Sequence, residues 1–272
     1  MKLKGLAKFL ILFIGLMILM INLWVDHEEH PDDYTALDIP ECEELDAEDS
    51  VRMRILHSRS WTEYLNNSGF CSQYDIGYDE VSEAEMNRNK ISVPYWIDEP
   101  DYWRQVYSQL YVDSKDHLQA LQDSLLRIKE LRNLDRDAFA TMVVAFVQDI
   151  PYEYVIPDEC TGSEVSPCNG NVAMGIYSPV EFLGRMHGDC DTRTVLLYTL
   201  LRNLDYEPLI INSNEYLHSM LALDVASSGD DFEYKGKRYA YWETTNVGWL
   251  AGMLPPDMNN KDYWSVALDY EF

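Results

Sequence analysis

Basic side chains are scarce in this sequence. It has 21 Lys and Arg residues against 47 Asp and Glu residues, which gives a formal net charge of −26. A surface with this charge repels the phosphate backbone of DNA and RNA, so we expect no nucleic-acid partner. The glycine-rich patterns that bind phosphates or dinucleotides are also absent, which excludes the common nucleotide-binding motifs.

Metal-binding patterns are missing as well. The sequence contains no Cys-x-x-Cys pair and no His-x-x-x-His pair. A zinc site built from His187, Cys190 and His218 would need a further ligand, and no residue at a suitable spacing offers one. We therefore expect neither a metal nor another cofactor.

Cysteine is also rare, and its number is odd. The five cysteines are Cys42, Cys71, Cys160, Cys168 and Cys190. Four of them could form disulfides in an exported protein, and one would stay free. The short separation of Cys160 and Cys168 predicts one disulfide, which leaves Cys42 with Cys71 as the second pair and Cys190 as the free thiol.

The only long apolar run lies near the N-terminus, at residues 9–25, and its length is close to what a bilayer requires of a helix. Lysines precede it and acidic residues follow it, so the positive-inside rule predicts a cytoplasmic N-terminus. A cleaved signal peptide is the alternative, but no small-x-small site follows the run. We expect an uncleaved single-pass anchor in the cell membrane, with the rest of the chain outside the cytoplasm.

The chain beyond the anchor divides by composition. Residues 26–52 are acidic and poor in large aliphatic side chains, which is typical of a solvated juxtamembrane spacer. Residues 53–97 alternate and contain the turn sequence 66–69, so they predict a small β-rich extension with a hairpin. Residues 98–272 would form the main domain. The length of 272 residues and the 12% of aromatic residues suffice for a full hydrophobic core.

Within the main domain, helical patterns come first and strand patterns follow. Apolar residues recur at helical spacing before the break at Ile150-Pro151, and Asn133 or Asp135 could cap the last of these helices. Ser178 and Glu181 form a capping-box pattern. Strands are expected at 209–212, 218–225 and 238–244. This order indicates an α+β fold.

The most informative stretch is 187–194, which leads into an apolar run that ends at Leu201. Gly188 and the polar residues around Cys190 predict a tight turn that delivers a partly exposed thiol to a helix start. Unpaired N–H groups and the helix macrodipole favour the thiolate there. Cys190 is therefore a candidate nucleophile, and a buried structural cysteine is the alternative. His187, so near the thiol, is expected to be structural.

Two strand-like segments further along carry a histidine and an acid. His218 lies in the first and Glu243 in the second, so the chain order is Cys, His, acid. A carboxylate in an apolar strand needs a partner, and the Nδ1–H of His218 is a suitable one. Asp224 is the alternative acid, and a core histidine is the alternative role for His218.

These segments together resemble a known family. The stretches 146–152, 188–191 and 241–245, with His218 between the last two, are similar in order and spacing to the transglutaminase-like superfamily of papain-like cysteine enzymes, in its microbial membrane-anchored or secreted branch. The resemblance covers roughly residues 135 to 256. It implies a catalytic cysteine on a helix N-terminus, packed on an antiparallel sheet that carries the histidine and the acid. Much of the superfamily has aspartate where this chain has Glu243.

The resemblance also concerns the oxyanion donor. Gln148 resembles a recurrent family position and could supply a side-chain amide, with an ordinary helix-surface glutamine as the alternative. Helix geometry also offers the backbone N–H of Cys190.

The expected chemistry follows from these parts. A Cys190 thiolate, paired with a His218 imidazolium, would attack a carboxamide or peptide carbonyl and form a thioester. Water as the acceptor makes the protein a peptidase or amidase, which we favour, and a lysine amine would make it a crosslinking acyltransferase. We expect a peptide or protein substrate outside the cytoplasm. The alternatives are a catalytically silent binding or assembly module and a redox thiol protein. The oligomeric state is left open.

Overall fold

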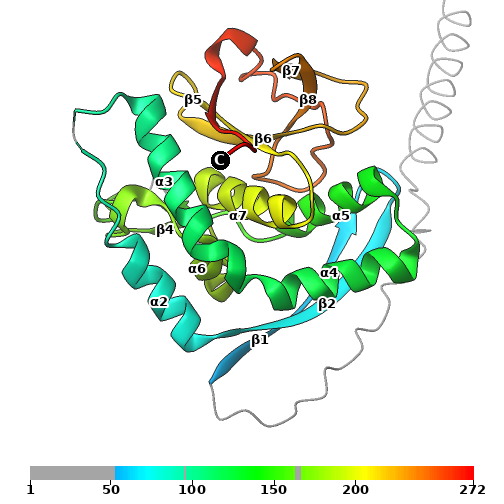
Figure 1. Cartoon of the computed structure of the whole chain (residues 1–272), viewed down its shortest axis with the longest axis horizontal. Coiled ribbons are helices and arrows are strands. Elements are labelled where there is room, and N and C mark those ends of the chain that lie inside the picture. Colours follow the sequence, from blue (N-terminus) through cyan, green and yellow to red (C-terminus); the bar gives the residue numbers. More distant parts are fainter. Residues whose placement is uncertain (1–52, 95, 163–166) are drawn as a thin grey trace, which may run out of the picture. The chain divides into compact units, whose positions relative to one another are not determined.

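The computed structural model describes residues 53–94, 96–162 and 167–272, which all belong to one compact unit of the chain (Figure 1). The expected anchor at 9–25 and the spacer at 26–52 lie outside the described residues. Among the helices that are described, none has the length and apolar character needed to cross a bilayer. We therefore correct the expected architecture: the structure supports an α+β fold with a curled antiparallel sheet, and it does not support a transmembrane helix preceding that fold.

An antiparallel hairpin opens the described chain, as predicted. Strands β1 (Arg54–Glu63) and β2 (Ser68–Gly77) pair along their whole length. Asn67 in the turn has a φ of 51°, a left-handed conformation that asparagine tolerates better than most residues. Helix α2 (Tyr78–Arg88) follows directly and was not predicted. Only two of its residues are buried, so its sequence carries little apolar periodicity.

The predicted helices follow, with predicted caps. Their bounds are α3 (Glu99–Ser114), α4 (Gln119–Arg132), α5 (Arg136–Gln148), α6 (Pro179–Arg185) and α7 (Cys190–Asn203). Asp135 caps α5, because its carboxylate accepts the Ala138 N–H at 2.9 Å. Ser178 and Glu181 form the predicted capping box at the start of α6.

The main sheet is built from the C-terminal third of the chain. Its strands are β5 (Leu209–Ser213), β6 (His218–Leu223), β7 (Asp231–Tyr234), β8 (Lys237–Trp242) and β9 (Ser265–Leu268). They lie in the order β7-β8-β6-β5-β9, and every neighbouring pair is antiparallel. Both edge strands are short and partly exposed, so sequence patterning did not reveal β7 or β9.

Each face of this sheet has its own core. Leu221 and Trp242 belong to the core cluster that includes α5 and α7, and α7 packs against β6 (Figure 1). Their neighbours Met220 and Tyr241 belong to a second cluster, which includes Trp264. Successive side chains of a strand point to opposite faces. Helix α7, which begins at Cys190, therefore packs on one face of the sheet, and the second cluster lies on the opposite face.

The N-terminal hairpin and α2 share the core of the main domain. Trp61 of β1 packs edge-on against Phe146 of α5, with ring centroids 5.1 Å apart. A buried bidentate ion pair joins α2 to α6: Arg88 Nε and Nη2 donate to the two Glu181 carboxylate oxygens at 2.8 and 2.9 Å. The exposed fractions of these side chains are 3% and 0%, so the pair is shielded from water.

Glu181→Gln should destabilise the protein by about 3 kcal/mol, because it leaves the Arg88 cation buried without a carboxylate. Chemical denaturation of the full chain measures this change in unfolding free energy. Glu85→Gln is the matched control: it removes the exposed partner of Arg185 and should cost less than about 0.5 kcal/mol. Equal effects of the two substitutions would contradict the prediction.

Candidate active site

The start of α7 is fixed by the turn that precedes it. Asp189 is the N-cap residue: its Oδ1 accepts the Thr192 N–H at 3.2 Å, and its Oδ2 accepts the Val155 N–H at 3.4 Å. A Cβ atom at Gly188 would lie 2.7 Å from the Thr192 Cγ2 atom, so close packing requires glycine there. The turn therefore places Cys190 at the first position of the helix, as the sequence predicts.

The thiol itself differs from expectation. Cys190 is 8% exposed, so the prediction of a partly exposed thiol is wrong. Its Sγ donates to Asp191 Oδ2 at 4.0 Å. Burial, and then the negative charges of Asp191 and Asp189, raise the pKa of the thiol well above its usual value, and hydrogen bonding from Ser219 offsets this only partly. The resting form is therefore the neutral thiol rather than the expected thiolate.

His218 and Glu243 form a buried pair. His218 opens β6 and Glu243 follows β8, and His218 Nε2 lies 2.8 Å from Glu243 Oε2. The predicted contact used Nδ1, so the ring orientation is corrected. The imidazole stands at the end of its strand, and its Nδ1 has no hydrogen-bond partner in the described part of the chain. That nitrogen is free to accept a proton.

The Glu243 carboxylate is held in its charged form. It is 2% exposed, and its Oε1 accepts the backbone N–H groups of Thr244 and Thr245 and the Thr245 hydroxyl. Burial raises the pKa of Glu243, but the hydrogen bond and charge of His218 and the Thr245 donors outweigh it, so the net pKa lies below the usual value. Trp264, 5% exposed, covers the histidine with its ring centroid 6.2 Å away.

Cys190 and His218 line the same groove, which has a volume of about 660 Å³. Aromatic and apolar side chains make up much of its wall: Ile150, Pro151, Tyr152, Tyr154, Tyr216, Leu217, Val247 and Met258. Within the described residues, no hydrogen bond joins the thiol to the imidazole. Catalytic hydrogen bonds are often long in unliganded sites and shorten when substrate binds. The structure thus unites His218 with Glu243 and gives both Cys190 and His218 access to one groove.

Gln148 was expected to donate to an oxyanion, but its side chain binds the protein backbone instead. Its side-chain Nε2 donates to the backbone carbonyl of Glu243 at 2.7 Å and to that of Trp249 at 2.9 Å. A side-chain amide has only two N–H groups. Neither remains for an oxyanion, so this expectation is corrected: Gln148 supports the backbone that carries the acid. The alternative acid, Asp224, follows the opposite end of β6 from His218.

Arg193 is a site residue that the sequence patterns did not reveal. It is fully buried on α7, and its guanidinium donates to four backbone carbonyls, those of Gly188, Val147, Thr244 and Ile150. These carbonyls belong to the cysteine turn, the end of α5 with the residues just after it, and the loop that follows β8 at Glu243. Burial lowers the pKa of Arg193 to about 10, so it stays charged at neutral pH. Arg193 stands among polar residues at the start of α7, so no local pattern marked it for burial.

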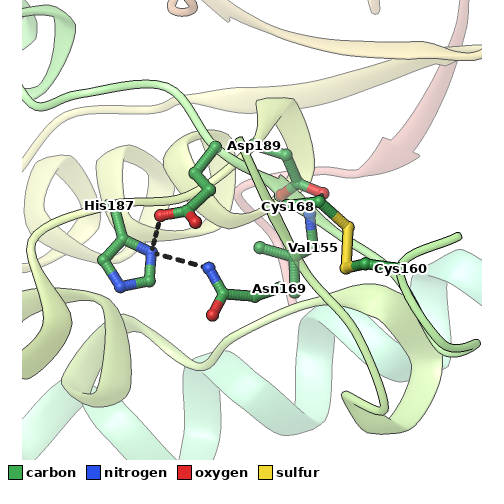
Figure 2. Close-up of a disulfide and its surroundings, with 7 residues drawn as sticks. Val155, Cys160, Cys168, Asn169, His187 and Asp189 are labelled. Atoms are coloured by element: carbon green, nitrogen blue, oxygen red, sulfur yellow. Dashed lines mark hydrogen bonds and ion pairs between the residues drawn. A yellow bond between two sulfur atoms is a disulfide. The ribbon is translucent and has the colours of Figure 1, made fainter. Parts of the chain in front are cut away.

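The predicted disulfide between Cys160 and Cys168 is present, and Figure 2 shows it beside the α7 cap. Strand β4 (Cys168–Asn169) pairs with β3 (Tyr154–Val155), and Val155 is the residue whose N–H reaches Asp189. The disulfide therefore braces the segment that holds the cap. Cys42 lies outside the described residues, so its pairing with Cys71 stays a prediction.

His187 lies in the same region, close to the disulfide rather than in the groove (Figure 2). Its Nδ1 is 2.9 Å from a Glu153 carboxylate oxygen, and the Asn169 side-chain amide approaches the same nitrogen at 3.3 Å. These contacts give it the structural role that was expected. No three His, Cys, Asp or Glu side chains are grouped to hold a metal ion in the ranges that the structure covers.

Arg193→Met should destabilise the protein by about 3 kcal/mol or more, because it leaves four buried carbonyls without their donors. Urea denaturation of the full chain tests this. The control is Arg104→Met on the exposed side of α3, which should change the unfolding free energy by less than about 0.5 kcal/mol. A loss at Arg193 no larger than that of the control would show that the guanidinium is dispensable.

Replacing Cys160 and Cys168 together by serine should lower the unfolding free energy by about 2.5 kcal/mol, the chain-entropy value for a sequence separation of 8. The measurement is again chemical denaturation, with Thr161→Ser in the same loop as the control. A loss below about 0.5 kcal/mol would indicate that the brace contributes nothing measurable.

The chain was also compared with known proteins. No protein-family model, no curated protein and no solved structure matches it.

Proposed function

We propose that this protein is a cysteine hydrolase of the transglutaminase-like type, a peptidase or amidase that acts through Cys190, His218 and Glu243. One observation carries the proposal: a buried His218–Glu243 pair, 2.8 Å apart, opens onto the groove that also receives the only free thiol among the described residues. The resemblance of the cysteine, histidine and acid segments to that superfamily supports the same conclusion.

The first chemical step joins Cys190 to the substrate in a tetrahedral intermediate, which becomes the thioester when the amine leaves. As Cys190 Sγ attacks the carbonyl carbon, its proton passes to His218 Nδ1, and the carbonyl oxygen becomes an oxyanion. The backbone N–H of Cys190, at the first position of α7, is one of the N–H groups that a helix leaves unpaired, so it can stabilise this oxyanion. Glu243 stabilises the imidazolium that forms and keeps Nδ1 directed away from itself.

The following steps release the products. The imidazolium gives its proton to the leaving amine as the carbon–nitrogen bond breaks. Water then attacks the thioester while His218 takes one of its protons, and the carbon–sulfur bond breaks to regenerate the thiol. An amine in place of water would give acyl transfer instead. We favour water because no feature of the groove marks an amine site.

The groove fits a peptide better than a small polar amide. Its wall carries three tyrosines and several aliphatic side chains, and the exposed fraction of Leu217 reaches 85%. Apolar wall groups of this kind bury the side chains of a bound chain and so orient its carbonyl. A peptide or protein is therefore the proposed substrate class.

Glu243→Gln should lower kcat/KM on a peptide substrate by about 10³- to 10⁴-fold, because a neutral amide no longer stabilises the imidazolium. Cleavage of a peptide library by the purified full chain, followed by mass spectrometry, supplies the substrate and the rates. Asp224→Asn is the matched control and should keep kcat/KM within about twofold. A larger loss of kcat/KM in Asp224→Asn than in Glu243→Gln would assign the role of the acid to Asp224.

Cys190→Ala should abolish turnover and change the unfolding free energy by only about 1 kcal/mol. Iodoacetamide should label Cys190 more slowly in His218→Ala than in the wild type, because the imidazole no longer takes the thiol proton. Equal labelling rates in the wild type and His218→Ala, with no cleavage of any peptide, would instead support a catalytically silent binding module.

A further inference from the structure

The thiol of Cys190 already has a hydrogen-bond partner, and it is not the histidine. Its Sγ donates to Asp191 Oδ2 at 4.0 Å, whereas no hydrogen bond to His218 occurs in the residues that the structure describes. An adjacent carboxylate is an unusual partner for a nucleophile, because a negative charge opposes ionisation of the thiol. The mechanism above assigns no task to Asp191.

The Asp191 carboxylate is held in place by elements far away in the sequence. The Tyr107 hydroxyl, on α3, donates to its other oxygen, Oδ1. Tyr107 is fully buried, and the Asn212 side-chain amide of β5 donates to the same hydroxyl at 3.1 Å. Two elements thus fix the acid while its Oδ2 faces the thiol.

The charges around the thiol are unbalanced. On its own helix Cys190 has the carboxylates of Asp191 and Asp189, and desolvation followed by the charge of Asp191 raises the pKa of Asp189 to about 7. Further ionisable groups near it are Tyr107 of α3, Tyr152 after α5, Arg193 of α7 and His218 of β6. Asp149, Tyr154 and Tyr216 line the same groove. Arg193 is occupied by carbonyls. His218 is therefore the group in the groove that can accept the thiol proton.

We propose that Asp191 is a second functional partner of the nucleophile: it keeps Cys190 as a neutral thiol in the resting site, so that the thiolate forms only when His218 takes the proton. This inference rests on the proposed function in naming Cys190 as the nucleophile. Asp191 contacts the reacting sulfur directly through Oδ2 and forms no covalent bond in the reaction. The thiol proton turns from Asp191 Oδ2 to His218 Nδ1 as the carbon–sulfur bond forms.

A resting thiol has a chemical consequence. The thiolate, not the thiol, reacts with electrophiles and oxidants. Asp191 would therefore protect Cys190 from alkylation and oxidation between catalytic cycles. Ser219 acts in the opposite direction: its backbone N–H and its hydroxyl favour the charged form of the thiol, and the hydroxyl also favours the Asp191 carboxylate.

The test is the pH dependence of Cys190 alkylation in the full chain, measured with iodoacetamide and mass spectrometry from about pH 5 to pH 10. Asp191→Asn keeps an oxygen for the Tyr107 hydroxyl but removes the charge. It should move the midpoint of the labelling curve about one pH unit lower and raise labelling at pH 7 about tenfold. Asp149→Asn is the matched control, since it removes a carboxylate from the same groove that pairs with Arg59, and it should change labelling less than about twofold.

A second variant has the opposite expected sign. Ser219→Ala removes a hydroxyl that favours the thiolate, so its labelling midpoint should move to higher pH. An unchanged or raised midpoint in Asp191→Asn, with the fold intact by circular dichroism, overturns the proposal. Should Asp191→Asn not fold, Asp191→Ser, which also removes the charge, is measured in its place, and an unchanged or raised midpoint again overturns the proposal. The labelling curve needs no substrate, so absence of peptide cleavage would refute the proposed hydrolase without affecting this result.

Discussion

A single buried cation fixes the place where the parts of this site meet. The Arg193 guanidinium lies among four backbone carbonyls from three separate segments and makes no hydrogen bond to a carboxylate in the described part of the chain. Hydrogen bonds from a charged donor are stronger than neutral ones, and burial strengthens them further. The turn before Cys190, the end of α5 and the loop just beyond Glu243 are therefore held at one point. Moving any of them would leave a charge or a carbonyl unsatisfied.

Around that point, carboxylates of similar type behave differently because their surroundings differ. Burial raises the pKa of Glu243, but three donors to one oxygen and the imidazole on the other reverse the effect. Asp189 and Asp191 have fewer donors, lie close to each other and are desolvated, so their pKa values are raised. The surroundings therefore separate these acids: the pKa of Glu243 lies below its usual value, and those of Asp189 and Asp191 lie above theirs.

Local signals in the sequence account for much of the fold and for part of the site. The caps at Asp135 and Ser178, the helix start at Cys190 and the strands that carry His218 and Glu243 depend on neighbouring residues, so pattern reasoning finds them. Other features depend on segments that meet only after folding. Three features are of this kind, and no sequence periodicity encodes them. His218 contacts Glu243 through Nε2, Gln148 donates to two backbone carbonyls, and Arg193 is buried.

The contacts of the site also extend beyond the segment that resembles the superfamily, roughly residues 135 to 256. Tyr107 precedes that segment and positions Asp191, while Trp264 follows it and covers His218. Each contributes a large buried side chain at a spot where a shorter residue would admit water. Water near the thiol would weaken the effect of the Asp191 charge, and water near the imidazole would compete for Glu243. Helix α3 and the segment that carries Trp264 therefore belong to the surroundings of the candidate site, since their side chains contact Asp191 and His218.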